Sequence, residues 1–128
     1  MDKNRLIFVV DDDQFITTLV ERRFTAEGYR IMSFDYGEEC LKSMKLNPDL
    51  IILDYFFHHA GKEVMNGMQV LDEIKALRPN VPVIMLSSQD KGEVVLELAR
   101  KGIEDYVIKD NNLIENLSTA IKDILSRE

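Results

Sequence analysis

Short apolar runs alternate with longer segments of helical period five times along the chain. The apolar runs predict strands over residues 5–10, 30–34, 50–53, 82–86 and 104–108. In the segments between and after them, apolar positions recur every three or four residues, as on one face of a helix. These segments predict helices over 14–27, 37–46, 68–77, 91–101 and from Leu113 to Leu125. Only residues 55–66 show no clear period.

The apolar strands indicate the class of fold. Strand 50–53 is apolar at every position, which is typical of a parallel strand buried on both faces. Five β/α units of this kind predict an α/β protein with helices on both faces of one sheet. Because crossover connections are right-handed, few strand orders are possible. We expect a flavodoxin-like (βα)5 doubly wound parallel sheet with strand order 2-1-3-4-5.

Polar side chains follow four of the apolar runs, at the points where the strands end. They are Asp11, Asp12 and Asp13 after the first run, Asp54 after the third, Ser87 after the fourth and Lys109 after the fifth. The carboxyl ends of parallel strands share one edge of the sheet, so we expect all six groups at one crevice. Crowded carboxylates repel one another, and their pKa values rise unless a cation neutralises them. The pattern therefore indicates a site for a hard metal ion and a phosphoryl group.

The residue types suggest a role for each group. Asp54 is the candidate nucleophile, because a carboxylate can attack phosphorus and carry the phosphoryl group as an acyl phosphate. Mg²⁺ suits such a site, since it takes oxygen ligands and usually binds through one or two carboxylates. Asp11 and Asp12, together with Asp54, would supply those oxygens. Lys109 can pair with Asp54 at rest and with phosphoryl oxygens afterwards, and Ser87 offers a hydroxyl donor.

Length, composition and charge narrow the classes of function. The 128 residues, 45% hydrophobic and 30% charged, predict one globular domain over 1–128 with no output domain. No run approaches the roughly 18 apolar residues of a membrane span, and no signal peptide precedes the first strand. The net charge of −7 argues against direct nucleic-acid binding. A single cysteine, Cys40, excludes an internal disulfide and fits a cytoplasmic location.

This set of residues at these strand ends closely resembles that of the receiver domain of bacterial two-component response regulators, the chemotaxis-regulator-like domain. The resemblance covers the chain from about Leu6 to Leu125. It implies that Asp11 and Asp12 are the family's acidic pair and that Asp54 is the phosphoacceptor. It also implies that Ser87 is the switch hydroxyl, Tyr106 the switch aromatic residue and Lys109 the conserved-type lysine. It also implies that Phe56 contributes its backbone carbonyl to Mg²⁺. The implied metal ligands are Asp11, Asp12, Asp54 and Phe56.

The resemblance implies a signalling protein rather than an enzyme, and the expected lack of an output domain makes it a stand-alone receiver. A sensor histidine kinase or phosphotransfer protein would phosphorylate Asp54 with Mg²⁺ bound, and Ser87 and Lys109 would then move toward the phosphoryl group. Tyr106 would turn inward, which would change a surface over residues 90–127 that binds a downstream protein or a second copy of the chain. The side chain of Phe56 would screen the acyl phosphate from water and slow self-dephosphorylation.

Two features depart from the family's pattern. The loop after Asp54 runs through residues 55–65 without proline before it reaches Asn66-Gly67, and it is longer than usual. Phe56 and Phe57 are expected to pack down over this loop, with an exposed contact to a partner as the alternative. The family's lysine usually precedes a proline in a cis peptide bond, whereas Lys109 precedes Asp110. A cis bond without proline costs roughly 2.5–4 kcal/mol, so we predict a trans Lys109–Asp110 bond.

Several alternatives stay open on the sequence alone. Asp13 can either join the acidic cluster or cap the helix that begins near Gln14. His58 and His59 could suggest a metal site, but neighbours in an extended chain point in opposite directions, so a loop that faces solvent or a partner is favoured. A pseudo-receiver that binds a partner without phosphorylation is one rival. A haloacid-dehalogenase-type phosphatase, with Asp11 as its nucleophile, is the other.

Overall fold

Five parallel strands form the centre of the molecule. The structure, a computed structural model, describes residues 4–57, 64–88 and 92–127. The strands are β1 (Leu6–Val10), β2 (Arg30–Phe34), β3 (Leu50–Asp54), β4 (Val83–Ser87) and β5 (Asp105–Ile108). They lie in the order β2-β1-β3-β4-β5, and every neighbouring pair is parallel. The flavodoxin-like order predicted from the sequence is confirmed.

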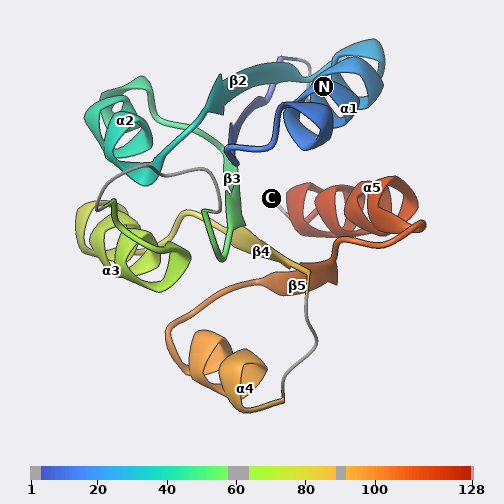
Figure 1. Cartoon of the computed structure of the whole chain (residues 1–128). Helices are drawn as coiled ribbons and strands as arrows, with labels where there is room; N and C mark the ends of the chain where they lie inside the picture. The colour runs from blue at the N-terminus through green and yellow to red at the C-terminus, as the bar shows by residue number, and fades with distance from the viewer. Residues whose placement is uncertain (1–3, 58–63, 89–91, 128) are drawn as a thin grey trace.

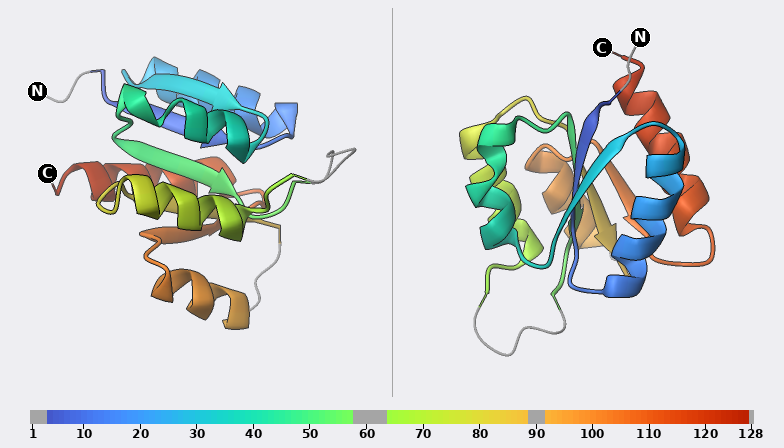
Figure 2. Two further views of the ribbon diagram at one scale, coloured as in Figure 1. Left: turned by 90° about the vertical axis from the view of Figure 1, so that its left-hand side faces the viewer. Right: turned by 90° about the horizontal axis from the view of Figure 1, so that it is seen from above.

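Helices cover both faces of this sheet. They are α1 (Gln14–Ala26), α2 (Gly37–Lys42), α3 (Gly67–Leu77), α4 (Gly92–Arg100) and α5 (Leu113–Leu125), with a short 3₁₀ turn, η1 (Met44–Leu46), after α2. Figure 1 shows α1 and α5 on one face, α2 and α3 on the other, and α4 beyond β5. Figure 2 shows the same three layers from two further directions. Within the described ranges, no helix is long and apolar enough to cross a bilayer.

The predicted helix over 37–46 is divided in two. Helix α2 ends at Lys42, and the chain continues as η1 until Asn47 turns left-handed with φ of 64°. Asn47 precedes Pro48, and a proline excludes the helical conformation from the residue before it. Asparagine tolerates the left-handed region better than most residues, which suits it to this exit. Gly28 and Gly102 also have positive φ, and each follows the end of a helix.

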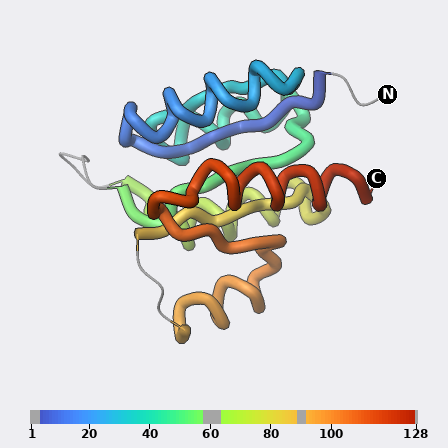
Figure 3. The backbone as a smooth tube through the Cα atoms, turned by 90° about the vertical axis from the view of Figure 1, so that its right-hand side faces the viewer, coloured from blue at the N-terminus to red at the C-terminus, as the bar shows by residue number. Residues whose placement is uncertain are grey.

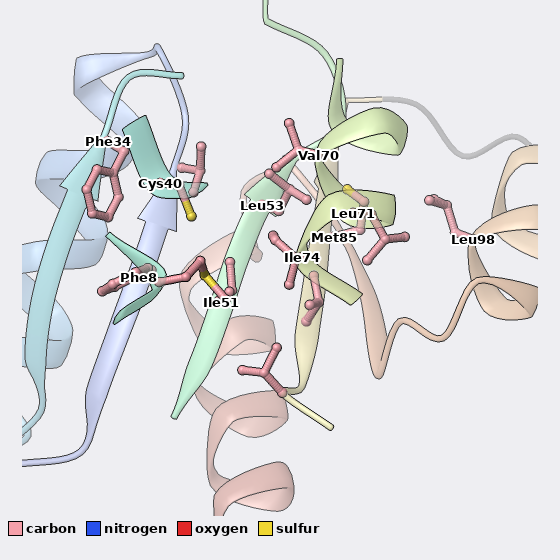
Figure 4. Packing of buried hydrophobic residues seen from close by; sticks show 14 of the residues in the cluster. Phe8, Phe34, Cys40, Ile51, Leu53, Val70, Leu71, Ile74, Met85 and Leu98 are labelled. Atoms are coloured by element: carbon pink, nitrogen blue, oxygen red, sulfur yellow. The ribbon is translucent and has the colours of Figure 1, made fainter. Parts of the chain in front are cut away.

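The core forms two layers, one on each side of the sheet. Strands β1, β3 and β4 are buried over their whole length, whereas the edge strands β2 and β5 are partly exposed. Alternation along β3 sends Ile51 toward α2 and α3, and the next residue, Ile52, toward α1 and α5. Figure 4 shows the first of these layers, with α3 contributing Val70, Leu71 and Ile74. The central strands thereby anchor the edge on which the polar residues lie.

Helix α4 has fewer buried residues than any of the other four described α-helices. Leu98 is its only buried residue among those described, and Leu96 is 60% exposed. Leu98 points from α4 into the layer formed by α2 and α3 (Figure 4). A salt bridge of 2.9 Å from Lys101, just beyond α4, to Asp72 adds a tie to α3. Segments with few buried contacts open at the lowest free energy, so α4 is the element that shifts most easily.

Backbone hydrogen bonds extend the sheet by one residue at three strand exits. They run from Asp11 N to Phe34 O (3.0 Å), from Tyr55 N to Leu86 O (2.8 Å) and from Lys109 N to Ser87 O (2.8 Å). These bonds hold the residues after β1, β3 and β5 in register with their neighbouring strands. The start of β1 and the end of α5 lie together at the opposite edge (Figure 3). The carboxyl edge is therefore built on rigid backbone.

Candidate functional site

Three carboxylates lie together at the carboxyl edge of the sheet. Asp11 and Asp12 follow β1, and Asp54 is the last residue of β3. Each offers one oxygen within 4.8 Å of the oxygens of the other two. They are 0%, 8% and 2% exposed respectively. The convergence predicted from the strand order is therefore present, and it occurs where water is largely excluded.

The ammonium group of Lys109 joins two of these carboxylates. Its Nζ lies 2.8 Å from Oδ2 of Asp11 and 2.9 Å from Oδ1 of Asp54. The other oxygen of Asp11 accepts a hydrogen bond of 2.9 Å from the backbone N–H of Asp13. Oδ2 of Asp54 is buried and has no hydrogen-bond partner among the described residues. One oxygen of Asp54 is thus left available for a ligand.

Burial controls the protonation of this cluster. It raises the pKa of Asp54 to about 7, and the nearby charge of Asp11 adds to the rise, although Lys109 and the backbone N–H of Phe56 oppose it. Burial also raises the pKa of Asp11, against the opposing effect of Lys109. Burial acts to lower the pKa of Lys109, but its contacts with Asp11 and Asp54 outweigh this and leave the pKa raised. Among the described residues, the ion pairs place one cation, Lys109, against two of the acids, Asp11 and Asp54.

The donor set suits Mg²⁺. Carboxylate oxygens from Asp11, Asp12 and Asp54 are the hard ligands that this ion prefers. One oxygen of each carboxylate lies within 4.8 Å of the other two, which is close enough for a single ion to contact all three residues. A divalent ion would also supply the positive charge that the cluster lacks. Phe56 lies at the same site, since its N–H binds the Asp54 carboxylate. The metal-binding role of its carbonyl stays a prediction.

Asp13 does not join the cluster. Its carboxylate accepts a hydrogen bond of 2.9 Å from the backbone N–H of Phe15 and caps α1. Of the two alternatives that the sequence left open, the structure therefore favours the cap. The expectation that all six strand-end groups converge is wrong for this residue, because its own helix begins at the next position and offers unsatisfied N–H groups.

Ser87 and Tyr106 occupy the two neighbouring strands. Ser87 is the final residue of β4 and is buried, one position inside the strand rather than beyond it. The strand is longer than predicted because the carbonyl of Ser87 accepts from the N–H of Lys109. Tyr106 in β5 is half-buried and packs against the layer on the side of α2 and α3. The switch roles of both residues stay predictions.

The two aromatic residues after the acceptor point in different directions. Phe57 is buried and its ring packs against that of Tyr36, with centroids 6.1 Å apart. Phe56 is 57% exposed. The expectation that both pack down is right only for Phe57, because successive side chains of an extended segment face opposite sides. His58 and His59 lie outside the described residues.

The second departure from the family pattern alters the start of α5. The Lys109–Asp110 bond is trans, as predicted, since no peptide bond in the described part of the chain is cis. The side chain of Asp110 accepts a hydrogen bond of 2.8 Å from the N–H of Asn112, and its carbonyl accepts from Leu113. Asp110 therefore forms an Asx turn that leads into α5.

Sequence reasoning missed the function of Gly67. A Cβ atom at this position would lie 2.5 Å from the carbonyl oxygen of Asp54 and 2.6 Å from Cα of Tyr55. Only glycine lets α3 begin this close to the end of β3. The family pattern marks Asn66-Gly67 as the end of the loop, but it does not indicate this close approach. The capping box between Asn66 and Gln69, by contrast, follows a recognisable spacing.

Comparisons with known proteins agree with this geometry. The family model for the response regulator receiver domain matches residues 7–122, so the chain belongs to that family. The chain is 32% identical to PhoP of Bacillus subtilis, an alkaline phosphatase synthesis transcriptional regulatory protein, over 97% of the chain and 50% of PhoP. It is 36% identical to the Bacillus subtilis transcriptional regulatory protein CssR, over 80% of the chain and 44% of CssR. The chain thus spans about half the length of these curated relatives.

Solved structures show the same fold. The response regulator DrrB of Thermotoga maritima, an OmpR/PhoB homologue, superimposes with a TM-score of 0.83 at 31% identity, over 97% of this chain and 54% of DrrB. The signal receiver domain of a Luxo repressor protein from Vibrio parahaemolyticus gives 0.84 at 26% identity, over 97% of this chain and 92% of that domain. The receiver domain is a signalling domain, and its acidic pocket is where the family binds Mg²⁺.

The raised pKa of Asp54 predicts how stability depends on pH. The folded protein keeps a proton that the unfolded chain releases between its ordinary pKa of 3.8 and about 7, so stability falls as pH rises through that window. Asp54→Asn removes this loss. In urea unfolding with a chelator, we expect the variant to exceed the wild type by about 1–3 kcal/mol at pH 8. A difference that is the same at pH 4 and pH 8 would contradict the assignment.

The close approach at Gly67 predicts that a single methyl group is costly there. Gly67→Ala forces α3 away from the backbone of Asp54 and should lower the free energy of unfolding by about 1–3 kcal/mol. Gly92→Ala is the matched control, since Gly92 also begins a helix and an added Cβ meets no atom of the described residues within 4 Å. We expect the control to stay within about 0.5 kcal/mol of the wild type. Equal midpoints for both variants in denaturant would refute the packing argument.

Proposed function

We propose that this chain is a response regulator receiver that accepts a phosphoryl group on Asp54 from a histidine kinase or phosphotransfer protein. The observation that carries the proposal is the buried ion-pair geometry, in which Lys109 bridges Asp11 and Asp54 while Oδ2 of Asp54 has no partner among the described residues. A carboxylate with one oxygen oriented by a cation and the other unengaged is positioned for attack on phosphorus.

The residues divide the reaction between them. Oδ2 of Asp54 forms a bond to phosphorus as the P–N bond to the donor histidine breaks, and the imidazole leaves with the electron pair of that bond. Asp11, Asp12, Asp54 and the carbonyl of Phe56 would hold Mg²⁺, and the ion would offset the charge of the carboxylates and the phosphoryl group. Lys109 then pairs with a phosphoryl oxygen, and the hydroxyl of Ser87 donates to another.

Phosphorylation would be read out through the face made by α4, β5 and α5. Ser87 and Tyr106 lie in adjacent strands, so movement of Ser87 toward the phosphoryl group would leave room for Tyr106 to turn inward. Leu98 is the only buried side chain in the described part of α4, and its shift costs little. A changed surface over residues 90–127 would then bind a downstream protein or a second copy of the chain.

Three expectations from the sequence accompany the proposal. A receiver without an output domain stays a prediction, since the curated relatives extend well beyond the region they share with this chain. A cytoplasmic location and an absence of direct nucleic-acid contact also stay predictions. The downstream partner is identified here only by the surface that it would contact.

The direct test is phosphorylation by a small donor. With Mg²⁺ and acetyl phosphate, we expect mass spectrometry to detect one added phosphoryl group that is stable in acid and labile in base. Asp54→Asn should abolish the adduct, whereas Asp11→Asn should retain it when the metal is in excess. A pseudo-receiver would give no adduct with any variant. Hydrolysis of a phosphate ester that requires Asp11 as nucleophile would instead indicate the phosphatase.

The exposed ring of Phe56 predicts the lifetime of the acyl phosphate. Its position two residues beyond Asp54 allows the ring to shield the phosphoryl group from attacking water. Phe56→Asn should speed the loss of phosphate by about tenfold or less. A tenfold change in rate corresponds to about 1.4 kcal/mol of activation free energy, which is the size expected for the loss of one shielding contact. The measurement is the decay of the phosphorylated protein after removal of the donor. An unchanged decay rate would exclude the shielding role, and Phe15→Asn, at an exposed ring on α1, is the control.

A further inference from the structure

The start of α2 contacts both described ends of the segment between β3 and α3. Three successive residues make separate contacts there. The ring of Tyr36 packs against Phe57 on the outgoing limb, and Glu38 accepts a hydrogen bond of 2.9 Å from the backbone N–H of Met65 on the returning limb. Between them, a Cβ on Gly37 would lie 2.1 Å from Cγ2 of Val70, so α2 presses directly on α3.

The returning limb transmits this contact to Asp54. Three consecutive backbone N–H groups each have a defined acceptor. Met65 donates to Glu38, Asn66 to the side chain of Gln69, and Gly67 to the carbonyl of Tyr55 at 3.0 Å. Gly67 in turn lies against the carbonyl of Asp54. Displacement of Met65 therefore moves the first residue of α3, which touches the backbone of Asp54.

We propose that Glu38 is a positioning residue for the reaction at Asp54. Its carboxylate fixes the returning limb, so that Gly67 stays seated against the end of β3 and the acceptor carboxylate keeps its orientation toward Lys109. The proposal rests on the function proposed above, because the reaction it tunes is the phosphorylation of Asp54. It assigns a role to the first turn of α2, which contributes no residue to the acidic cluster.

The geometry of Glu38 distinguishes it from a solvated surface charge. Its Oε1 is buried and has no hydrogen-bond partner among the described residues, while Oε2 holds Met65. Its neighbour Glu39 occupies the same first turn of α2 and is exposed. Burying the Oε1 atom of Glu38 without a hydrogen bond costs free energy. The hydrogen bond from Met65 to Oε2 forms in spite of that cost. Glu39 provides the matched control.

The test compares four variants with the wild-type protein. Glu38→Ala removes the acceptor, Glu38→Gln keeps a carbonyl oxygen that can accept from Met65, and Glu38→Asp keeps the charge on a shorter side chain. Glu39→Ala removes the neighbouring exposed charge. Three quantities are measured: the initial rate of phosphorylation by acetyl phosphate, the dissociation constant for Mg²⁺ by calorimetry, and amide hydrogen exchange at Met65 and Gly67.

We expect Glu38→Ala and Glu38→Asp to slow phosphorylation and weaken Mg²⁺ binding by about threefold to tenfold, the range of one lost hydrogen bond. Exchange at Met65 and Gly67 should accelerate in both. Glu38→Gln and Glu39→Ala should stay within about twofold of the wild type. If Glu38→Ala does not fold, the phosphorylation rate and the Mg²⁺ affinity of Glu38→Asp test the proposal.

Two results would overturn the proposal. One is a Glu38→Asp variant with faster exchange at Met65 but an unchanged rate and an unchanged Mg²⁺ affinity. The other is a Glu38→Gln variant as impaired as Glu38→Ala, which would assign the effect to charge. Failure of the wild type to take up phosphate would refute the proposed function alone. In that case Mg²⁺ affinity and exchange would still decide whether Glu38 positions Asp54.

Discussion

One ammonium group between two buried carboxylates is the interaction on which the site depends. Nζ of Lys109 lies within 2.9 Å of oxygens of both Asp11 and Asp54, and the fold removes both carboxylates from water. Without that cation, the two acids would repel each other and take up protons. Even with it, the pKa of Asp54 stays near 7. The cluster is short of positive charge, and this is the condition under which a divalent cation binds well.

The sheet makes this arrangement possible. Lys109 follows β5, whereas Asp54 ends β3, so the lysine side chain must reach across the end of β4. Strand β4 ends in Ser87, which is buried at the same edge. Backbone hydrogen bonds hold the residues after the strands in register, so the charged groups stand on a rigid edge. The contacts from Tyr36 and Glu38 tie Phe57 and Met65, which lie between β3 and α3, to the start of α2.

The sequence predicted what depends on period and strand order, and it missed what depends on close packing. All-apolar runs identify β1, β3 and β4, because strands buried on both faces tolerate few polar residues. The positions of Asp11, Asp54 and Lys109 at the strand ends then follow from the parallel topology. Gly67 and Glu38 carry no such signal, because their neighbours are distant in sequence and adjacent only in the folded chain. Asp13 was ambiguous, since a strand-end acid and a helix cap share the same position.

The charge imbalance can be measured directly at the acceptor. The carboxyl carbon of Asp54, observed by NMR as the pH is varied, reports the pKa of this one group with and without Mg²⁺. In the metal-free protein we expect a value of about 7, and an excess of Mg²⁺ should lower it toward the ordinary value of 3.8. A metal-free value near 3.8, or a raised value that excess Mg²⁺ leaves unchanged, would contradict a buried acidic cluster built to hold a cation.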